Sequence, residues 1–139
     1  MFKFFSRFIL LAIILGASAC AVMQPKTDEE IVEKRSALRL EALKKLDFEK
    51  AYTYMSPGYR SIKGLDRFKL DYAGAVNMLG FNVNSVECNM DTCSVLVASD
   101  YKVAIVGRGF SATKPLVIDR VNKETWIRSD GKWWFVKSE

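Results

Sequence analysis

The hydrophobic pattern of this 139-residue chain changes its period once, near Gly80, and that change restricts the fold more than any other feature. Before Gly80 the apolar residues recur every three to four positions, as on one face of an α-helix. After it they alternate, as in a β-strand. Helices followed by strands are typical of α+β domains, in which the helices pack on one face of an antiparallel sheet. Since a chain of 139 residues suffices for one core, we expect one α+β domain.

Three helices are expected before Gly80. Thr27 and Glu30 form a capping-box pattern, which marks the start of the first helix. Asp47 and Asp66 are of a residue type that caps helices, so each should begin a further helix. Ser56-Pro57-Gly58 should end the second helix, because the residue before a proline is pushed out of helical geometry. The expected ranges are Asp28 to Leu46, Asp47 to Tyr54 or Met55, and Asp66 to about Gly74.

Four antiparallel strands are expected after Gly80. Asp130-Gly131 is the strongest turn signal, since this pair favours the type I′ turn of a two-residue hairpin. Such a turn would pair Ser129 with Lys132 and Trp126 with Phe135. The expected strands are Phe81 to Cys88, Cys93 to Val106, Leu116 to Ser129 and Lys132 to Lys137.

Both faces of the last hairpin carry apolar side chains. One face should cover the helices, and the other needs a further explanation, because an antiparallel sheet can leave one face in water. Either sheet curvature buries both faces within one monomer, or a second protomer, a ligand or a partner covers the second face. The two sets are Trp126, Trp133 and Phe135 on one face, and Ile127, Trp134 and Val136 on the other.

Cys88 and Cys93 are expected to form a disulfide. They enclose four turn-type residues between two strand-like runs, so their thiols should face each other across the mouth of a hairpin. The chain has three Cys and no His, which leaves too few ligands for a zinc site, and we expect no metal and no other cofactor. The pair is not a Cys-x-x-Cys motif, which disfavours a redox role. Closing this short loop should stabilise the fold by about 2 kcal/mol.

Residues 1–19 have the features of an export signal: a short basic region, an apolar run from Phe8 to Leu15 and a series of small residues. The apolar run is too short to span a bilayer, which takes about 20 residues. Ala17-Ser18-Ala19-Cys20 resembles the lipobox of bacterial lipoproteins, in which the chain is cut before the cysteine and the thiol is acylated. The resemblance implies lipid attachment at Cys20, a tether of residues 20–27 and a domain of residues 28–139.

The alternative is an ordinary signal peptide that is cut after Ala19, because Ala17-Ser18-Ala19 also fits the small-x-small pattern of secreted proteins. Acyl chains would hold the protein at a membrane, since each buried methylene contributes about 0.8 kcal/mol. Ala21 follows the cysteine where an aspartate would signal inner-membrane retention, which resembles the outer-membrane default. We therefore expect a bacterial envelope protein that is anchored in the outer membrane and faces the periplasm.

The charge distribution disfavours nucleic acid as a partner. Loss of Lys3 and Arg7 with the signal peptide lowers the formal net charge of +5 by two, so the mature chain is only mildly basic. Lysines and arginines alternate with acidic residues, and no single-sign stripe of the kind that nucleic-acid binders carry is present. An exported protein also meets little nucleic acid.

Two segments resemble the NTF2-like fold, which is also called SnoaL-like or cystatin-like. Residues 43–60, LKKLDFEKAYTYMSPGYR, resemble the ALxxxDFxxAYxYxSPxYR stretch of small NTF2-like envelope proteins of proteobacteria. Residues 126–134, WIRSDGKWW, resemble the closing hairpin of that fold. The resemblance covers roughly residues 28–136. It implies a cone in which N-terminal helices pack on a curved antiparallel sheet.

This fold supports enzymes and binding modules alike, so the function must be argued from the mouth of the cone. The enzymes that the chain resembles place an aspartate with a tyrosine or a histidine in the cavity. Without histidine only an Asp/Tyr arrangement remains, with Asp71 or Asp100 as base and Tyr52, Tyr72 or Tyr101 as hydrogen-bond donor. Basic residues lie beside both aspartates in the sequence, which favours solvated or ion-paired carboxylates over a catalytic role.

We therefore expect a non-enzymatic binding or assembly module for an envelope protein, glycan or lipid. A small-molecule enzyme of the isomerase or dehydratase type, or a carrier, is the alternative function, and a homodimer is an alternative oligomeric state. Arg128 should make a cross-strand cation-π contact with Trp133. The candidate pocket or surface residues are Tyr52, Tyr72, Asp100, Trp126, Arg128 and Trp133.

Overall fold

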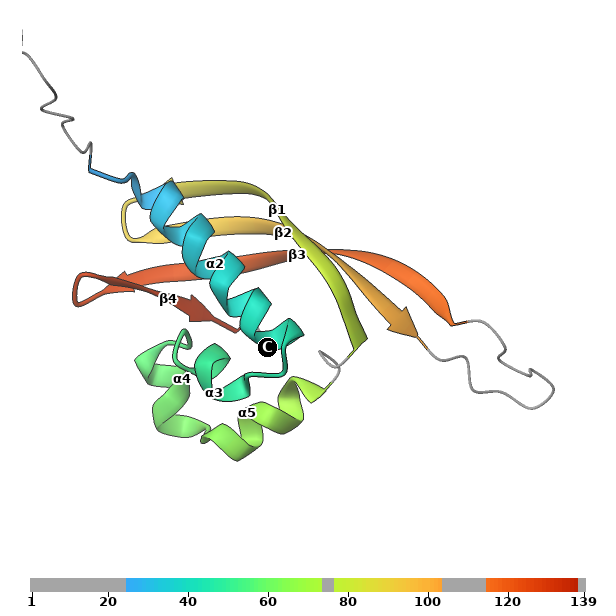
Figure 1. Cartoon of the computed structure of the whole chain (residues 1–139). Helices are drawn as coiled ribbons and strands as arrows, with labels where there is room; N and C mark the ends of the chain where they lie inside the picture. Colours follow the sequence, from blue (N-terminus) through green and yellow to red (C-terminus); the bar gives the residue numbers. More distant parts are fainter. Residues whose placement is uncertain (1–24, 74–76, 104–114, 138–139) are drawn as a thin grey trace, which may run out of the picture.

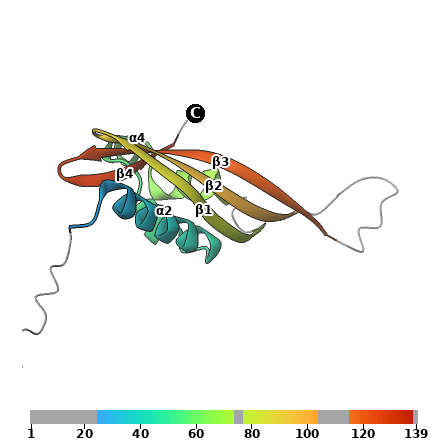
Figure 2. The same ribbon diagram turned by 90° about the horizontal axis from the view of Figure 1, so that it is seen from above.

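The computed structural model describes residues 25–73, 77–103 and 115–137 of the chain. Helices cover one face of a four-stranded antiparallel sheet whose strands follow one another in sequence order, so the α+β prediction is confirmed (Figure 1). Figure 2 shows α2 lying against that face of the strands. The helices are α2 (Asp28–Lys44), α3 (Phe48–Tyr52), α4 (Pro57–Ile62) and α5 (Leu65–Asp71). The strands are β1 (Met78–Asn89), β2 (Thr92–Val103), β3 (Leu116–Ser129) and β4 (Lys132–Val136).

The first two helices begin where their caps predict. The Thr27 side chain accepts from the Glu30 N–H while the Glu30 carboxylate accepts from the Thr27 N–H, which is the complete capping box. The Asp47 carboxylate accepts from the Lys50 N–H at the start of α3. Each cap satisfies backbone donors that the first helical turn leaves without a partner.

Two helix predictions need correction. α3 ends at Tyr52, before the predicted end at Tyr54 or Met55, and Ser56-Pro57-Gly58 starts α4: the Ser56 hydroxyl accepts from the Tyr59 N–H, and Pro57 takes the first helical position, where no N–H is needed. The third predicted helix begins at Leu65 after Gly64, so Asp66 lies in its first turn and is not its cap. Its carboxylate still lies close to the positive end of the helix.

The hairpins follow the predicted pairing. Ser129 pairs with Lys132 and Trp126 with Phe135, and both turn residues have positive φ, 52° for Asp130 and 70° for Gly131, as a type I′ turn requires. Cys88 pairs with Cys93 and the two form a disulfide, as predicted. The ends of three strands differ from the prediction. β1 runs from Met78 to Asn89, β2 starts at Thr92 and β4 ends at Val136. The predicted end of β2 at Val106 lies outside the described residues.

The last hairpin is covered within the monomer on its helix side and along its outer edge. Trp126, Trp133 and Phe135 are at most 7% exposed and belong to the core. The chain after α3 runs along β4, where the Phe135 N–H donates to Tyr54 O and the Ser56 N–H donates to Phe135 O, each at 2.9 Å. On the second face, the Trp134 ring is half-buried with the guanidinium of Arg60 5.1 Å from its centroid and that of Arg35 5.7 Å away.

The sequence predictions for the N-terminus lie outside this description. Residues 1–24, and with them the predicted acylation site Cys20, are not among the described residues. Within the described part of the chain, every helix is too short or too polar to cross a bilayer.

Candidate ligand-binding cavity

Two polar residues lie in the middle of the buried stripe of α2. Val32, Ser36, Arg39, Leu40 and Leu43 follow the three-to-four-residue spacing of one helix face, and all are at most 4% exposed. Arg39, at 3%, is the unusual member, because arginine is rarely buried unless its charge is paired. A strand residue supplies the partner.

Glu124 of β3 pairs with Arg39 and is itself buried. It lies two residues before Trp126 on the strand. Because side chains two positions apart share one face of a sheet, both face the helices. Its carboxylate accepts from the Ser36 hydroxyl at 2.8 Å, from the Trp126 indole N–H at 2.9 Å and from Nη2 of Arg39. These donors offset the cost of taking a carboxylate out of water. They also occupy the oxygens that a general base would need.

The Arg39 guanidinium is paired on one side only. It lies over the Phe135 ring, 3.9 Å from the centroid, and donates to Glu124 through Nη2. Its Nε and Nη1 are buried and have no acceptor among the described residues. An arginine with buried, unused donors beside a charged partner is a fixed polar group on the buried face of the helix.

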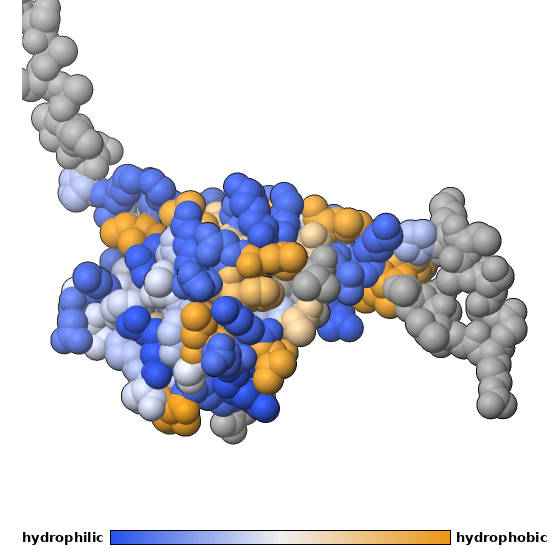
Figure 3. All heavy atoms as spheres, turned by 60° about the horizontal axis from the view of Figure 1, so that its bottom comes forward, coloured by the Kyte–Doolittle hydropathy of each residue, from blue (hydrophilic) through white to orange (hydrophobic). Residues whose placement is uncertain are grey.

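A cavity of about 520 Å³ opens against this pair, bounded by α2, α5 and the inner faces of β1, β2 and β3. Its volume lies in the range of about 300 to 1,000 Å³ that is typical of small-molecule sites. Arg39 and Glu124 form part of its lining. Figure 3, in which the bottom of the Figure 1 view comes forward, shows hydrophobic and hydrophilic residues interspersed on this side of the molecule. The apolar lining includes Leu40, Leu43, Met78, Val97, Ile118 and Phe135.

Asp71 and Tyr72 enter the lining from the end of α5. The Asp71 carboxylate lies 3.0 Å from Nζ of Lys137 and 3.4 Å from Nζ of Lys63. Lys137 and then Lys63 hold the pKa of Asp71 below its usual range despite partial desolvation. Asp71 is therefore ionised at neutral pH and is a weak base.

The two tyrosines of this region remain protonated. Burial raises the pKa of Tyr72, and Glu124 adds to that effect while Arg39 opposes it. Burial, followed by the charge of Asp71, raises the pKa of Tyr59 to about 12, and the Tyr59 hydroxyl donates to Asp71 at 3.3 Å. At neutral pH both side chains are therefore hydrogen-bond donors and not bases.

The residues that the sequence singled out are divided between different parts of the molecule. Tyr72 and Tyr101 line the cavity, whereas the Tyr52 hydroxyl donates to Lys63 O at 2.8 Å and its ring packs on Phe68. Asp100 is exposed and is not part of the lining. Its strand neighbours Ser99 and Tyr101 line the cavity, so Asp100 lies on the opposite face of the strand. Asp100 and these tyrosines therefore do not form an acid-base pair.

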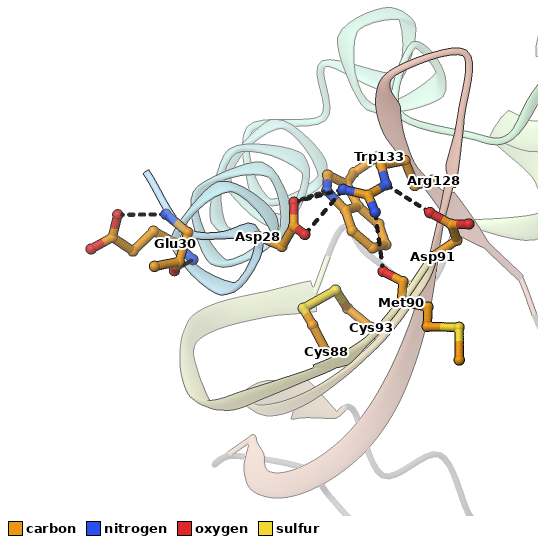
Figure 4. A network of polar contacts seen from close by, with 9 residues as sticks. Asp28, Glu30, Cys88, Met90, Asp91, Cys93, Arg128 and Trp133 are labelled. Atoms are coloured by element: carbon orange, nitrogen blue, oxygen red, sulfur yellow. Dashed lines mark hydrogen bonds and ion pairs between the residues drawn. A yellow bond between two sulfur atoms is a disulfide. The ribbon is translucent and has the colours of Figure 1, made fainter. Parts of the chain in front are cut away.

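Arg128 and Trp133 lie at the opposite end of α2 from the cavity, in a polar network (Figure 4). Arg128 donates to both carboxylate oxygens of Asp28, at 3.1 and 3.2 Å, and to Asp91 at 2.7 Å. The Trp133 indole N–H donates to Asp28 at 3.1 Å, and the predicted contact of Arg128 with the Trp133 ring is present, 5.2 Å from the centroid. Asp91 comes from the turn that the Cys88–Cys93 disulfide closes. This network joins α2 to two hairpins and is structural.

Sequence reasoning missed Ser36, Arg39 and Glu124. A signal was present, because two polar residues occupy the apolar stripe of an amphipathic helix and an acidic residue occupies the inward position before Trp126 in a strand. Among the described residues, no three His, Cys, Asp or Glu side chains gather in a way that could hold a metal ion.

Comparison with solved structures identifies the fold. A SEC-C motif containing protein from Rhodopseudomonas palustris aligns with 73% of this chain and 71% of its own, at 16% identity and a TM-score of 0.53. One from Psychrobacter arcticus covers 84% of this chain and 64% of its own, at 10% identity and a TM-score of 0.57. A protein from Streptomyces avermitilis, described as a dehydratase of the NTF2-like family, covers 80% and 93%, at 16% identity and a TM-score of 0.50.

The fold is NTF2-like. This confirms the fold that residues 43–60 and 126–134 predict. At such identities the similarity establishes the fold and not an activity. No family model and no curated protein sequence matches the chain.

Proposed function

We propose that this protein is a non-enzymatic binding module of the bacterial envelope, which takes a small envelope component into its NTF2-like cavity and is anchored through acyl chains on Cys20. The observation that carries the binding role is the state of Glu124. The carboxylate lines an open cavity, as a catalytic base would, yet it already accepts hydrogen bonds from Ser36, Arg39 and Trp126. Such a group shapes and polarises a site, and its oxygens are already engaged by donors of the protein.

The catalytic alternative has little support among the described lining residues. Asp71 lies beside Tyr72, but the ammonium groups of Lys137 and Lys63 keep it ionised and lower its pKa. A base with a lowered pKa removes protons poorly near pH 7, whereas enzymes of this kind raise the pKa of the catalytic carboxylate. We therefore favour binding or carriage over an Asp/Tyr isomerase or dehydratase.

The position of the cavity suits a tethered protein. Cys20 precedes the first turn of α2 by eight residues, and that turn holds Asp28 in the network with Arg128. Arg39 lies eleven residues further along α2, about 16 Å away at 1.5 Å per helical residue. A lipid at Cys20 would hold the Asp28 end near the membrane and leave the cavity end free.

The test is mass spectrometry of the protein extracted gently from its own membranes, under native and then denaturing conditions. We expect a chain that starts at an acylated Cys20, contains the Cys88–Cys93 disulfide and carries a small molecule that is lost on denaturation. An extracted protein with an empty cavity would contradict the binding role.

A Cys20→Ala variant tests the anchor separately. We expect it to lose its partition into detergent while the folded domain keeps its disulfide. Unchanged partition of this variant would show that the acyl anchor is wrong, and would leave the cavity result unaffected.

A further inference from the structure

We infer that the ligand of the cavity is a single-chain amphiphile with an anionic head, a long-chain carboxylate being the simplest member. This inference rests on the proposed binding function and names the ligand class for the same site. It follows from two features of the lining: an apolar inner wall, and cationic residues near the C-terminal end of β2 and in the first half of β3.

The inner wall suits an alkyl chain. Leu40 and Leu43 of α2 face Val97 of β2 across the cavity lining, and Ile118 of β3 extends this apolar surface toward the open end of the sheet. Val97 and Leu43 are buried, whereas Ile118 is half-exposed, so the apolar wall runs from the core toward solvent. Each methylene that leaves water against such a wall contributes favourably to binding.

The charges of the lining favour an anion. Four cationic residues, Arg39, Lys102, Arg120 and Lys123, contribute to it, together with the carboxylates of Asp71 and Glu124. Both carboxylates are already paired, Glu124 with Arg39, and Asp71 with basic residues of other segments. Among the described residues, Lys102, Arg120 and Lys123 have no ion-pair partner. Arg120 shares the inner face of β3 with Glu124, whereas Lys102 and Lys123 reach the lining from the outer face, which also carries Asp100 and Asp119, so the positive potential inside the cavity is centred on Arg120.

The geometry assigns the head of the amphiphile to Arg120. This residue is exposed and lies four positions before Glu124 on the same face of β3, about 13 Å away at 3.3 Å per strand residue. A head placed there keeps part of its hydration and avoids the cost of burying an anion beside Glu124. The chain then runs inward over Val97, which pairs with Asn122 of β3, toward Leu43 and Phe135.

The experiment measures binding to the intact acylated protein by native mass spectrometry. The protein is held in a sterol-based detergent, whose rigid skeleton differs from a straight chain. Three probes share one chain length and differ in the charge of the head: dodecanoate, dodecanol and dodecyltrimethylammonium. A single-chain anionic phospholipid serves as a fourth probe, so that a lipid headgroup is distinguished from a free acid as the source of the anion.

We expect dodecanoate to bind one-to-one and more tightly than dodecanol, with dodecyltrimethylammonium weakest. The triple variant Lys102→Gln, Arg120→Gln and Lys123→Gln should lose about tenfold in affinity for dodecanoate, because several partly exposed ion pairs each add a small amount. Its affinity for dodecanol should not change. A matched triple variant of exposed lysines outside the lining, Lys26→Gln, Lys50→Gln and Lys132→Gln, should bind like the wild type.

Equal binding of the anionic and cationic probes, or equal losses in the two triple variants, would overturn the inference. If the extracted protein holds a neutral or cationic molecule that dodecanoate does not displace, the inference fails while the binding function stands. If the protein neither carries a molecule nor takes up a probe, both fail. The variants replace exposed side chains, so folding is verified by the intact disulfide and the circular dichroism spectrum.

Discussion

The two ends of α2 are each joined to β3 by an arginine-carboxylate pair, and the two pairs lie in opposite surroundings. At the N-terminal end Asp28 meets Arg128 with both side chains more than a third exposed. At the other end Arg39 meets Glu124 with both at most 6% exposed. Asp28 and Arg39 are three helical turns apart, and Glu124 and Arg128 are four residues apart on one face of the strand.

This difference separates a structural end from an end that borders a cavity. The exposed pair is part of a larger network. Arg128 also donates to Asp91 in the turn that the disulfide closes, and Asp28 also accepts from the Trp133 indole, so the polar groups of the pair have partners within the protein. The buried pair retains unused donors on Arg39 and borders an open cavity. A guanidinium and a carboxylate therefore join helix and strand at the surface in one place, and form a polar part of a cavity wall in the other.

The largest expected effect comes from breaking the buried pair. Glu124→Leu leaves the Arg39 guanidinium buried without a counter-charge, and we expect a loss of about 3 to 5 kcal/mol in the free energy of unfolding. Chemical denaturation measures it. The double variant Arg39→Met/Glu124→Leu should recover most of the loss, because it removes both charges. A single variant as stable as the wild type would contradict the account of this end.

The disulfide comes next. Cys88→Ser/Cys93→Ser should lower the stability by about 2 kcal/mol through loss of a closed six-residue loop. The melting temperature with and without reductant gives the same comparison in the wild type. Since the disulfide lies at the structural end, ligand retention below the melting temperature should not change. A melting temperature that is insensitive to reductant would show that this turn is held by other contacts.

Breaking the exposed pair should have a smaller effect than removal of the disulfide. Arg128→Gln removes contacts to Asp28 and Asp91, but water and salt replace them at the surface. The decrease in melting temperature should shrink as sodium chloride is raised, and that salt dependence distinguishes it from Glu124→Leu. A loss as large as that of Glu124→Leu would remove the contrast between the two ends.

The smallest effect concerns pH at the edge of the cavity. Lys137 and Lys63 lower the pKa of Asp71, so its contribution to stability is complete above the usual aspartate range and is lost as the pH falls through the lowered pKa. Asp71→Asn should therefore be less stable than the wild type at pH 7, and the difference should diminish below about pH 4. A difference that grows in acid would have the wrong sign.

The fold could be predicted in large part because its signals are local. The change of period at Gly80, the Thr27/Glu30 capping box and the Asp130-Gly131 turn each act over a few residues, and the structure has all three elements. α4 was missed because Pro57 was interpreted only as a helix stop, although a proline fits the first position of a new helix equally well.

The cavity was less predictable because its defining contact is long-range. Arg39 and Glu124 are 85 residues apart in sequence, and no local pattern states which buried helix position meets which strand position. Asp100 was a candidate because the enzymes that the chain resembles place an aspartate in the cavity, yet strand alternation directs it away from the cavity, between two residues that line it. Counting alternation from the buried Trp126 would have excluded it and selected Glu124.

The most direct test of a ligand-binding end fills the cavity without disturbing the core. Wild-type protein and the variant Ile118→Trp, at a half-exposed lining position, are extracted in parallel and compared by native mass spectrometry. We predict that the wild type carries a small molecule and that the variant, equally folded and acylated, has lost most of it. Equal retention in both, or an empty wild type, would contradict the assignment of this cavity as the binding site.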